Sequence, residues 1–295
     1  MHLLLADSGL GGLAVCAGVE RRLREAGGLR EVRLTYFNAA PASSWGYNDL
    51  PKLRDRVALL QRALTAMERL NPDRIVLACN TLSVLYERLN RRREGAPPVR
   101  GILEAGVRLF AEALAEDPEG LLLLLGTRTT IEAGAHRKRL RERGFPRGRM
   151  LSMSCHGLAR AIEADPEGPQ ARSRIQDCAA RLPALGRRCR RLFAALACTH
   201  YGFAARLIRE AFEARAGQPV IILDPNERLA EEAADDAVKA AAPGFRSGQA
   251  DIRVRVLSKI PLPRDSREAI AARLRNSSEA AAEALLDCVF DPDLF

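Results

Sequence analysis

The same short motif occurs twice in this chain of 295 residues, and that internal repeat constrains the fold more than any other feature. The sequence reads LACNT around Cys79 and LACTH around Cys198. The same offset of 119 residues aligns LLLADSG at 3–9 with LLLLGTR at 122–128. Motifs that recur in register predict two similar α/β halves that face each other across a shared cleft.

Short apolar runs alternate with longer segments of helical spacing, as is typical of α/β proteins. Because the runs show little polar alternation, they predict parallel strands with helices on both faces and ligand sites at their carboxyl ends. The sequence thus predicts two doubly wound α/β domains related by a pseudo-twofold axis, with the active site between them. The expected strands are 2–6, 32–37, 74–78, 99–102, 121–125, 193–197, 219–223 and 252–257, and helical spacing covers 50–70, 106–115 and 201–216.

The distribution of these runs predicts a first domain that is interrupted by the second. The second domain is expected to begin near residue 102 and to comprise 102–212. The patterns from 221 onward have no evident counterpart in the second half, so the first domain is expected to comprise 1–101 and 213–295.

The composition is that of an ordinary soluble globular protein, with 47% hydrophobic and 28% charged residues. The longest run of leucines, 121–125, is too short to span a bilayer, and Asp7 interrupts the only apolar stretch near the N-terminus. We therefore expect a cytoplasmic protein that does not contact the membrane. The seven cysteines show neither Cys-x-x-Cys nor zinc-site spacing, so free thiols and no metal site are expected.

The formal charge of +9 comes from arginine-rich runs at 91–93, 136–139 and 187–191. Such runs have two explanations, a nucleic-acid surface or solvated helix faces. The runs contain few aromatic residues and alternate with Glu and Ala, which favours helix faces and makes a nucleic-acid partner a weak alternative. The positive balance favours a small anionic substrate. The sequence leaves the oligomeric state open, with a homodimer among the alternatives.

Both repeated cysteines follow an apolar run and precede a helical pattern. This predicts that each sulfur lies close to a helix N-terminus, where free N–H groups and the helix dipole stabilise a thiolate. Either cysteine alone is compatible with simple packing in the core. Two at matching positions favour a functional role, and His200 is placed to orient or protonate what Cys198 handles.

Paired thiols on opposite walls of a cleft suit the inversion of a carbon that carries a weakly acidic hydrogen. One base must remove a proton from one face, and an acid must deliver a proton to the other face. A single group can only restore the original configuration. Cys79 and Cys198 are therefore the candidate acid–base pair of a racemase.

Polar residues at the ends of the first and fifth expected strands complete the candidate site. The DSGLGG segment at 7–12 permits a tight turn whose N–H groups can approach an anion, but it lacks the Gly-Lys-Ser/Thr ending of a phosphate loop. Asp7 can bind a substrate ammonium group or tune a nearby thiol. Thr127, which aligns with Ser8 in the repeat, lies in a segment whose hydroxyl and N–H groups suit a carboxylate.

The chain resembles the glutamate racemases of the aspartate/glutamate racemase superfamily. The resemblance rests on DSGLGG at 7–12, ACNT at 78–81, GTRTTI at 126–131 with GA at 134–135, and CTHY at 198–201, which together cover nearly the whole chain. It implies two α/β domains, an amino-acid racemase that needs no pyridoxal phosphate or metal, and a role in supplying D-glutamate for peptidoglycan.

The resemblance also assigns roles to individual residues. It makes Cys79 and Cys198 the two acid–base groups, and it matches Glu163 to a family glutamate that supports the second cysteine. The residues that it implies hold the substrate are Asp7, Ser8, Asn80, Thr81, Thr199 and His200.

Two segments depart from the family pattern. The family reads YFGDT and then PYG, where this chain has YFNAA at 36–40 and SWG at 44–46. Ala39 replaces an aspartate that supports the first cysteine, so we expect Cys79 to differ from Cys198 in proton affinity. Trp45 and Gly46 are expected to offer backbone groups to a substrate carboxylate.

Racemisation of glutamate is the leading hypothesis. The alternatives are racemisation of another acidic amino acid such as aspartate, and a weakened homologue that binds a partner through its arginine-rich surface. A one-sided decarboxylase is disfavoured because both cysteines are present.

Overall fold

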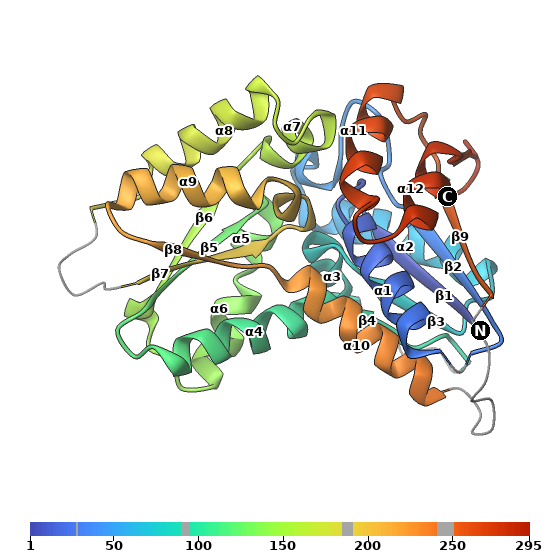
Figure 1. Ribbon diagram of the computed structural model, residues 1–295, viewed down its shortest axis with the longest axis horizontal. Helices are drawn as coiled ribbons and strands as arrows, with labels where there is room; N and C mark the ends of the chain where they lie inside the picture. Colours follow the sequence, from blue (N-terminus) through green and yellow to red (C-terminus); the bar gives the residue numbers. More distant parts are fainter. Residues whose placement is uncertain (28, 90–94, 185–190, 241–250) are drawn as a thin grey trace.

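The computed structural model describes residues 1–295 except for 28, 90–94, 185–190 and 241–250, and it contains two parallel β-sheets (Figure 1). The first sheet has the strand order β10 (Val289–Phe290), β9 (Asp251–Ser258), β2 (Glu31–Asn38), β1 (His2–Asp7), β3 (Arg74–Leu77) and β4 (Val99–Gly101). The second has the order β6 (Met150–Ser154), β5 (Leu121–Gly126), β7 (Leu192–Ala197) and β8 (Val220–Leu223). The predicted α/β class is confirmed.

Helices cover both faces of each sheet, as Figure 1 shows. On the first sheet, one face carries α1 (Leu13–Ala26), α10 (Pro225–Ala240), α11 (Arg264–Leu274) and α12 (Glu279–Leu286), and the other carries α2 (Leu53–Arg69) and α3 (Asn80–Tyr86). On the second sheet, one face carries α7 (Leu158–Ala164), α8 (Pro169–Ala180) and α9 (Ala205–Ala216), and the other carries α4 (Ile102–Glu116) and α6 (Ala135–Glu142). The shorter elements are α5 (Arg128–Ala133), η1 (Tyr47–Asp49), η2 (Arg147–Arg149) and η3 (Thr199–Ala204).

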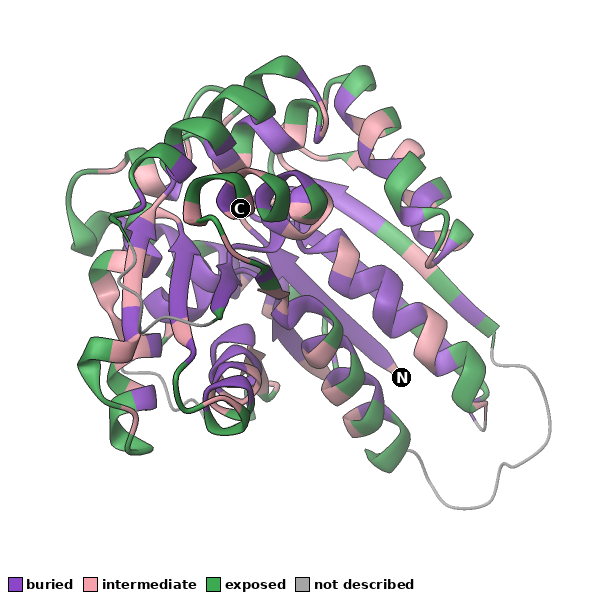
Figure 2. Cartoon of the chain, turned by 60° about the vertical axis from the view of Figure 1, so that its left-hand side comes forward, coloured by how far each residue is buried: buried purple, intermediate pink, exposed green. Residues whose placement is uncertain are grey.

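The leucine runs lack polar alternation because both faces of the strands are buried. Leu3 and Leu5 of β1 point into the core under α1, while Leu4 points into the core under α2. In β5, Leu123 and Leu125 likewise face one core, and Leu122 and Leu124 face the other. Strand side chains alternate between faces, and full burial of each leucine contributes about 2 kcal/mol. Figure 2 shows the result, with buried strands between helices whose outer faces are exposed.

The two sheets share one topology, which explains the repeat in the sequence. β2-β1-β3-β4 in the first sheet corresponds to β6-β5-β7-β8 in the second. Leu3 of β1 is paired with Arg74 of β3, and Leu122 of β5 is paired with Phe193 of β7, so the repeat of 119 residues also holds for the register. The expectation of two similar α/β halves is thus confirmed at the level of strand order.

The domain boundary expected at residue 213 needs correction. β8 (Val220–Leu223) pairs with β7 in the second sheet, just as β4 pairs with β3 in the first, so the region after 213 does have a counterpart. The chain returns to the first sheet only between β8 and α10. The other crossing runs directly from β4 into α4, and α4 and α10 lie against each other.

Two strands were not predicted. β6 reads MLSMS, in which serines interrupt the apolar run, and β10 contains only two residues. Both lie at the edge of a sheet, where a strand needs fewer apolar side chains.

Within the described residues, no helix has the length and apolar character needed to cross a membrane.

The arginine-rich run at 136–139 lies on α6, which has the solvated face expected of it. His136 is buried, whereas Lys138 is exposed and lies 3.9 Å from Glu142. Arg139 forms an ion pair with Glu104 of α4 at 3.1 Å. The run at 91–93, and the run at 187–191 apart from its last arginine, lie outside the described residues.

Candidate active site

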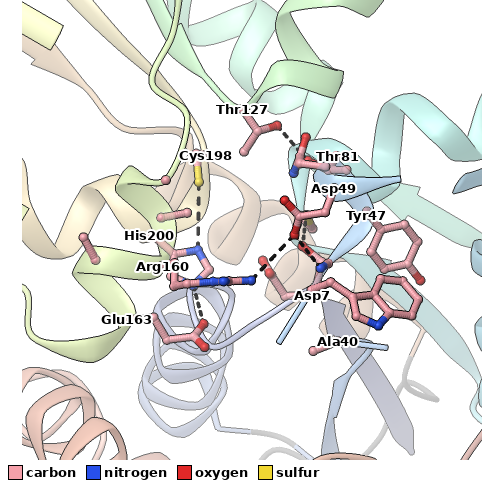
Figure 3. Close-up of a pocket in the computed structure, with 18 of the residues that line it drawn as sticks. Asp7, Ala40, Tyr47, Asp49, Thr81, Thr127, Arg160, Glu163, Cys198 and His200 are labelled. Carbon is pink, nitrogen blue, oxygen red and sulfur yellow. Dashed lines mark hydrogen bonds and ion pairs between the residues drawn. The ribbon is translucent and has the colours of Figure 1, made fainter. Parts of the chain in front are cut away.

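A cavity of about 580 Å³ lies at the carboxyl ends of the central strands and is lined by residues of both sheets (Figure 3). Cys79 follows β3 at the N-terminus of α3, and Cys198 follows β7 at the start of η3. Both thiols line the cavity. All the site residues expected from the sequence lie in its wall, namely Asp7, Ser8, Trp45, Gly46, Cys79, Asn80, Thr81, Thr127, Glu163, Cys198, Thr199 and His200.

Cys198, His200 and Glu163 form a connected series on one side of the cavity. Cys198 Sγ lies 3.9 Å from His200 Nδ1, and His200 Nε2 lies 2.7 Å from Glu163 Oε2. Figure 3 shows the imidazole between the sulfur and the carboxylate. Because α7 carries Glu163 and η3 carries His200, packing of these two elements sets the alignment.

The pKa values of this series favour a charged imidazole. Burial lowers the pKa of His200, but the hydrogen bonds and negative charges of Cys198 and Glu163 outweigh it, so that the His200 pKa lies well above its usual value. Burial raises the pKa of Glu163, but the hydrogen bond and charge of His200 and the Leu10 amide lower it below its usual value. His200 and Glu163 therefore form an ion pair.

The glycine-rich turn after β1 closes against this ion pair. The Leu10 N–H donates to Glu163 Oε2 at 2.7 Å, so the anion that the turn was expected to approach is the protein's own carboxylate. A Cβ at Gly9 would lie 2.5 Å from Glu163 Oε2, and one at Gly11 would lie 2.5 Å from His200 Nδ1. Glycine is therefore required at both positions for the turn to approach so closely.

Cys79 has a different environment. Ser8 Oγ lies 3.2 Å from its sulfur. Burial and the charge of Asp7 raise the pKa of Cys79 to about 12, although the hydrogen bond from Ser8 opposes this shift. Ala39 is fully buried in the same apolar cluster as Cys79. The surroundings of the two cysteines thus differ, and the expected difference in their proton affinity stays a prediction.

Asp7 connects the two halves at the centre of the site. Thr199 Oγ1 donates to Asp7 Oδ2 at 2.8 Å, and Asp7 is fully buried. Burial raises the pKa of Asp7, while the charge of His200 and the hydrogen bond from Thr199 oppose this shift. Among the described residues, Asp7 Oδ1 and both amide atoms of Asn80 are buried without a hydrogen-bond partner. Such atoms carry a free-energy cost unless a ligand satisfies them.

Hydroxyl groups from the two halves meet elsewhere in the wall. Thr81 Oγ1 at the start of α3 lies 2.9 Å from Thr127 Oγ1 at the start of α5. Thr127 is the N-cap of α5 and accepts a hydrogen bond from the Thr130 N–H at 3.5 Å. The two hydroxyls and the nearby helix N-termini are suited to an anionic group.

The expectation for Trp45 and Gly46 needs refinement. The Gly46 N–H does meet a carboxylate, but it is that of Asp49, at 2.8 Å. Asp49 lies 3.6 Å from Arg160, whose guanidinium also donates to the Ser44 carbonyl at 3.1 Å (Figure 3). The segment before η1 is thus joined across the cavity to α7.

Asp49, Arg160 and Arg56 were not predicted from the sequence. Arg160 lies three residues before Glu163, a spacing that places both on one face of a helix and could have indicated it. Arg56 of α2 is buried and donates to Thr129 Oγ1 of α5 at 2.9 Å. No sequence signal indicates that contact, because its partner lies in the other half.

Within the described residues, no group of three or more His, Cys, Asp or Glu side chains has an arrangement that could hold a metal ion.

Comparison with known proteins places the chain in a family. Residues 9–233 match the model of the Asp/Glu/Hydantoin racemase family. A glutamate racemase of Granulibacter bethesdensis is 31% identical over 248 residues, which cover 82% of this chain and 80% of that protein. A glutamate racemase of Chlorobaculum tepidum is 27% identical over 78% of this chain and 77% of its own.

Solved structures show the same fold. The glutamate racemase of Francisella tularensis in complex with D-glutamate has a TM-score of 0.66 at 17% identity, covering 99% of this chain and 98% of that one. The glutamate racemase of Campylobacter jejuni has a TM-score of 0.64 at 20% identity, covering 99% and 100%. From the family match and the curated relatives, the chain belongs to the Asp/Glu/hydantoin racemase family and is an amino-acid racemase, an isomerase.

Proposed function

We propose that the chain interconverts L- and D-glutamate without a cofactor, with Cys79 and Cys198 as the paired acid and base. The observation that carries this proposal is that two thiols, each at the carboxyl end of a strand in a different sheet, line one cavity. Inversion at Cα needs a base on one face and an acid on the other. Thiols in two facing halves supply both.

The surroundings of the two thiols distinguish the base from the acid for one enantiomer of the substrate. Burial and the charge of Asp7 hold Cys79 in the protonated form. At Cys198, a protonated His200 at 3.9 Å stabilises negative charge on sulfur. We propose that Cys198 acts as the base on one face of the substrate and that the Cys79 thiol acts as the acid on the other. Cys198 then removes the Cα proton of one enantiomer, Cys79 protonates the opposite face, and the roles reverse for the other enantiomer.

The unpartnered polar atoms fit an amino-acid substrate. Asp7 Oδ1 can accept a hydrogen bond from a substrate ammonium group, and the Asn80 amide can donate to a carboxylate. The hydroxyls of Thr81 and Thr127 are further donors in the same wall. We propose glutamate rather than aspartate because the curated relatives are glutamate racemases. Aspartate is the second candidate substrate.

The test is racemisation in deuterated water. Purified protein incubated with L-glutamate should produce D-glutamate that carries deuterium at Cα, measured by chiral chromatography and NMR. Cys79→Ser and Cys198→Ser should each abolish net inversion. Cys288→Ser is the matched control, because this half-buried cysteine does not line the cavity. Absence of exchange with both glutamate and aspartate at high enzyme concentration would contradict the racemase proposal and favour a binding protein.

We further propose that the enzyme works in the cytoplasm and that its product enters peptidoglycan precursors. The support is the enzyme family and the glutamate racemase names of the relatives. Expression of the chain should restore growth of a bacterial strain that lacks glutamate racemase and requires added D-glutamate. Failure of a soluble, racemisation-competent chain to restore growth would contradict this role.

A further inference from the structure

A second pair of thiols lies directly behind the Cys198 side of the cavity. Cys155 follows β6 and lines the cavity, whereas Cys178 lies in the last turn of α8 and does not. Both are buried in the apolar cluster that also contains Cys198. Arg181 Nη2 lies 3.3 Å from Cys178 Sγ and 2.8 Å from the carbonyl oxygen of Ser154, so the Cys178 sulfur lies beside the segment that carries Cys155. Neither cysteine has a part in the racemisation proposed above.

An arginine is positioned to keep one of these sulfurs charged. Arg181 Nη2 donates to Cys178 Sγ at 3.3 Å and to the Ser154 carbonyl at 2.8 Å, while the residue itself is exposed. The hydrogen bond from Cys155 and the charge of Arg181 lower the pKa of Cys178 against the effect of burial. The same hydrogen bond, together with burial, raises the pKa of Cys155. When an oxidant converts such a thiolate to a sulfenic acid, a neighbouring thiol can attack the oxidised sulfur and form a disulfide.

We propose that Cys155 and Cys178 form an oxidisable dithiol that hydroperoxides convert to an intramolecular disulfide. The Cys178 thiolate attacks the O–O bond and becomes a sulfenic acid, and the departing alkoxide or hydroxide takes the Cys155 proton. The Cys155 thiolate then attacks the sulfenic sulfur, the S–S bond forms, and hydroxide leaves. The two sulfurs together lose two electrons. These electrons reduce an organic hydroperoxide to an alcohol and hydroxide, or hydrogen peroxide to water and hydroxide.

The dithiol contacts the catalytic series through its backbone. The Cys155 carbonyl accepts a hydrogen bond from Tyr201 Oη at 3.2 Å, and Tyr201 directly follows His200 in η3. Cys155 is also three residues before α7, which carries Glu163. A covalent bond between Cys155 and Cys178 of α8 therefore displaces η3 and α7, the two elements that align His200 and Glu163. Oxidation is expected to lower racemisation.

The experiment is a peroxide titration of the full chain. Hydrogen peroxide is added to reduced protein, the remaining thiols are alkylated, and peptide mapping identifies the bonded cysteines. We expect a Cys155–Cys178 linkage and a loss of about two mass units. Racemisation should fall about tenfold or more, because general acid–base groups contribute about 10²–10⁴-fold, and dithiothreitol should restore it. The mapping result does not depend on racemase activity, so it tests the dithiol even if the proposed substrate is wrong.

Two variants and one control make the result specific. Cys178→Ser should keep the basal activity and lose the reversible inhibition. Arg181→Gln should slow disulfide formation, because the thiolate loses its positive neighbour. Cys288→Ser should behave as the unchanged chain. A disulfide between any other pair of cysteines, or the same reversible inhibition in Cys178→Ser, would overturn the proposal and assign the oxidation to other thiols, the catalytic pair among them.

Discussion

His200 and Glu163 form an ion pair in which Nε2 and Oε2 are 2.7 Å apart, and the pair lies directly behind Cys198. The Cys79 sulfur instead contacts the Ser8 hydroxyl, and Cys79 shares an apolar cluster with Ala39. The two cysteines therefore occupy equivalent positions in the two halves but lie in different electrostatic surroundings. The two half-reactions should differ in their sensitivity to substitution.

The first prediction concerns proton exchange on one side only. In Cys79→Ser, Cys198 remains as a base, so the variant should exchange the Cα proton of one glutamate enantiomer with deuterium without inverting it. In Cys198→Ser, the remaining thiol has a pKa raised to about 12, so exchange should be lost for both enantiomers near pH 8. NMR of each enantiomer in deuterated water measures this. Equal residual exchange in the two variants would contradict the asymmetry.

Glu163→Gln should shift the pH dependence of the reaction. Glu163 raises the pKa of His200, so the charged imidazole persists to higher pH in the unchanged chain. Without the carboxylate the His200 pKa falls, and the alkaline limb of the kcat/KM profile should move to lower pH. At its optimum, kcat should fall about 10²-fold. Glu142→Gln, which removes an exposed carboxylate on α6 outside the cavity, is the control and should leave the profile in place.

Asp7→Asn should make the protein more stable and less active. Burial raises the pKa of Asp7, so the folded state binds this proton more tightly than the unfolded chain, and ionisation at neutral pH lowers the free energy of unfolding. The substitution should therefore add about 1 kcal/mol at pH 7. The gain should shrink as the pH falls through the raised pKa of folded-state Asp7 and vanish near the usual aspartate pKa, and calorimetry at several pH values measures it. A lower melting temperature at pH 7 would contradict this account, and Asp293→Asn on the surface should change nothing.

Thr127→Val should weaken substrate binding. The substitution keeps the shape of the side chain but removes the hydroxyl that lies 2.9 Å from Thr81 Oγ1. Loss of a hydrogen bond from this hydroxyl to the substrate costs about 1 kcal/mol, which corresponds to about a fivefold rise in KM for glutamate. Steady-state kinetics measure this, and Thr65→Val on α2, outside the cavity, is the matched control. A large fall in kcat with an unchanged KM would show that Thr127 acts in the chemical step instead.

The central architecture could be predicted from the sequence because the same pattern occurs twice. The apolar runs that end at Asp7, Cys79, Gly126 and Cys198 are buried on both faces, so their composition identifies them as parallel strands. β8 was expected as a strand but assigned to the wrong half. Its pairing with β7 depends on contacts between distant segments, which a pattern of residue types does not contain.

The site residues that could be predicted are those at strand ends, where backbone topology brings them together. The contacts that fix their geometry could not be, because each joins two halves of the molecule. The Leu10 amide on Glu163 and the Arg56 guanidinium on Thr129 are examples. Such contacts depend on how the sheets are oriented, and no local signal along the chain carries that information.

The chain passes between the two sheets at two places. They lie at the junctions of β4 with α4 and of β8 with α10, on the side of the molecule opposite to the contact between α7 and α11 (Figure 1). Rotation of one sheet relative to the other about such crossings is a hinge motion. It would displace α7, which lies on the opposite side of the molecule, relative to the first sheet. Such a turn would separate Glu163 from Leu10. The alignment of His200, which is hydrogen-bonded to Glu163, therefore depends on the angle between the two sheets.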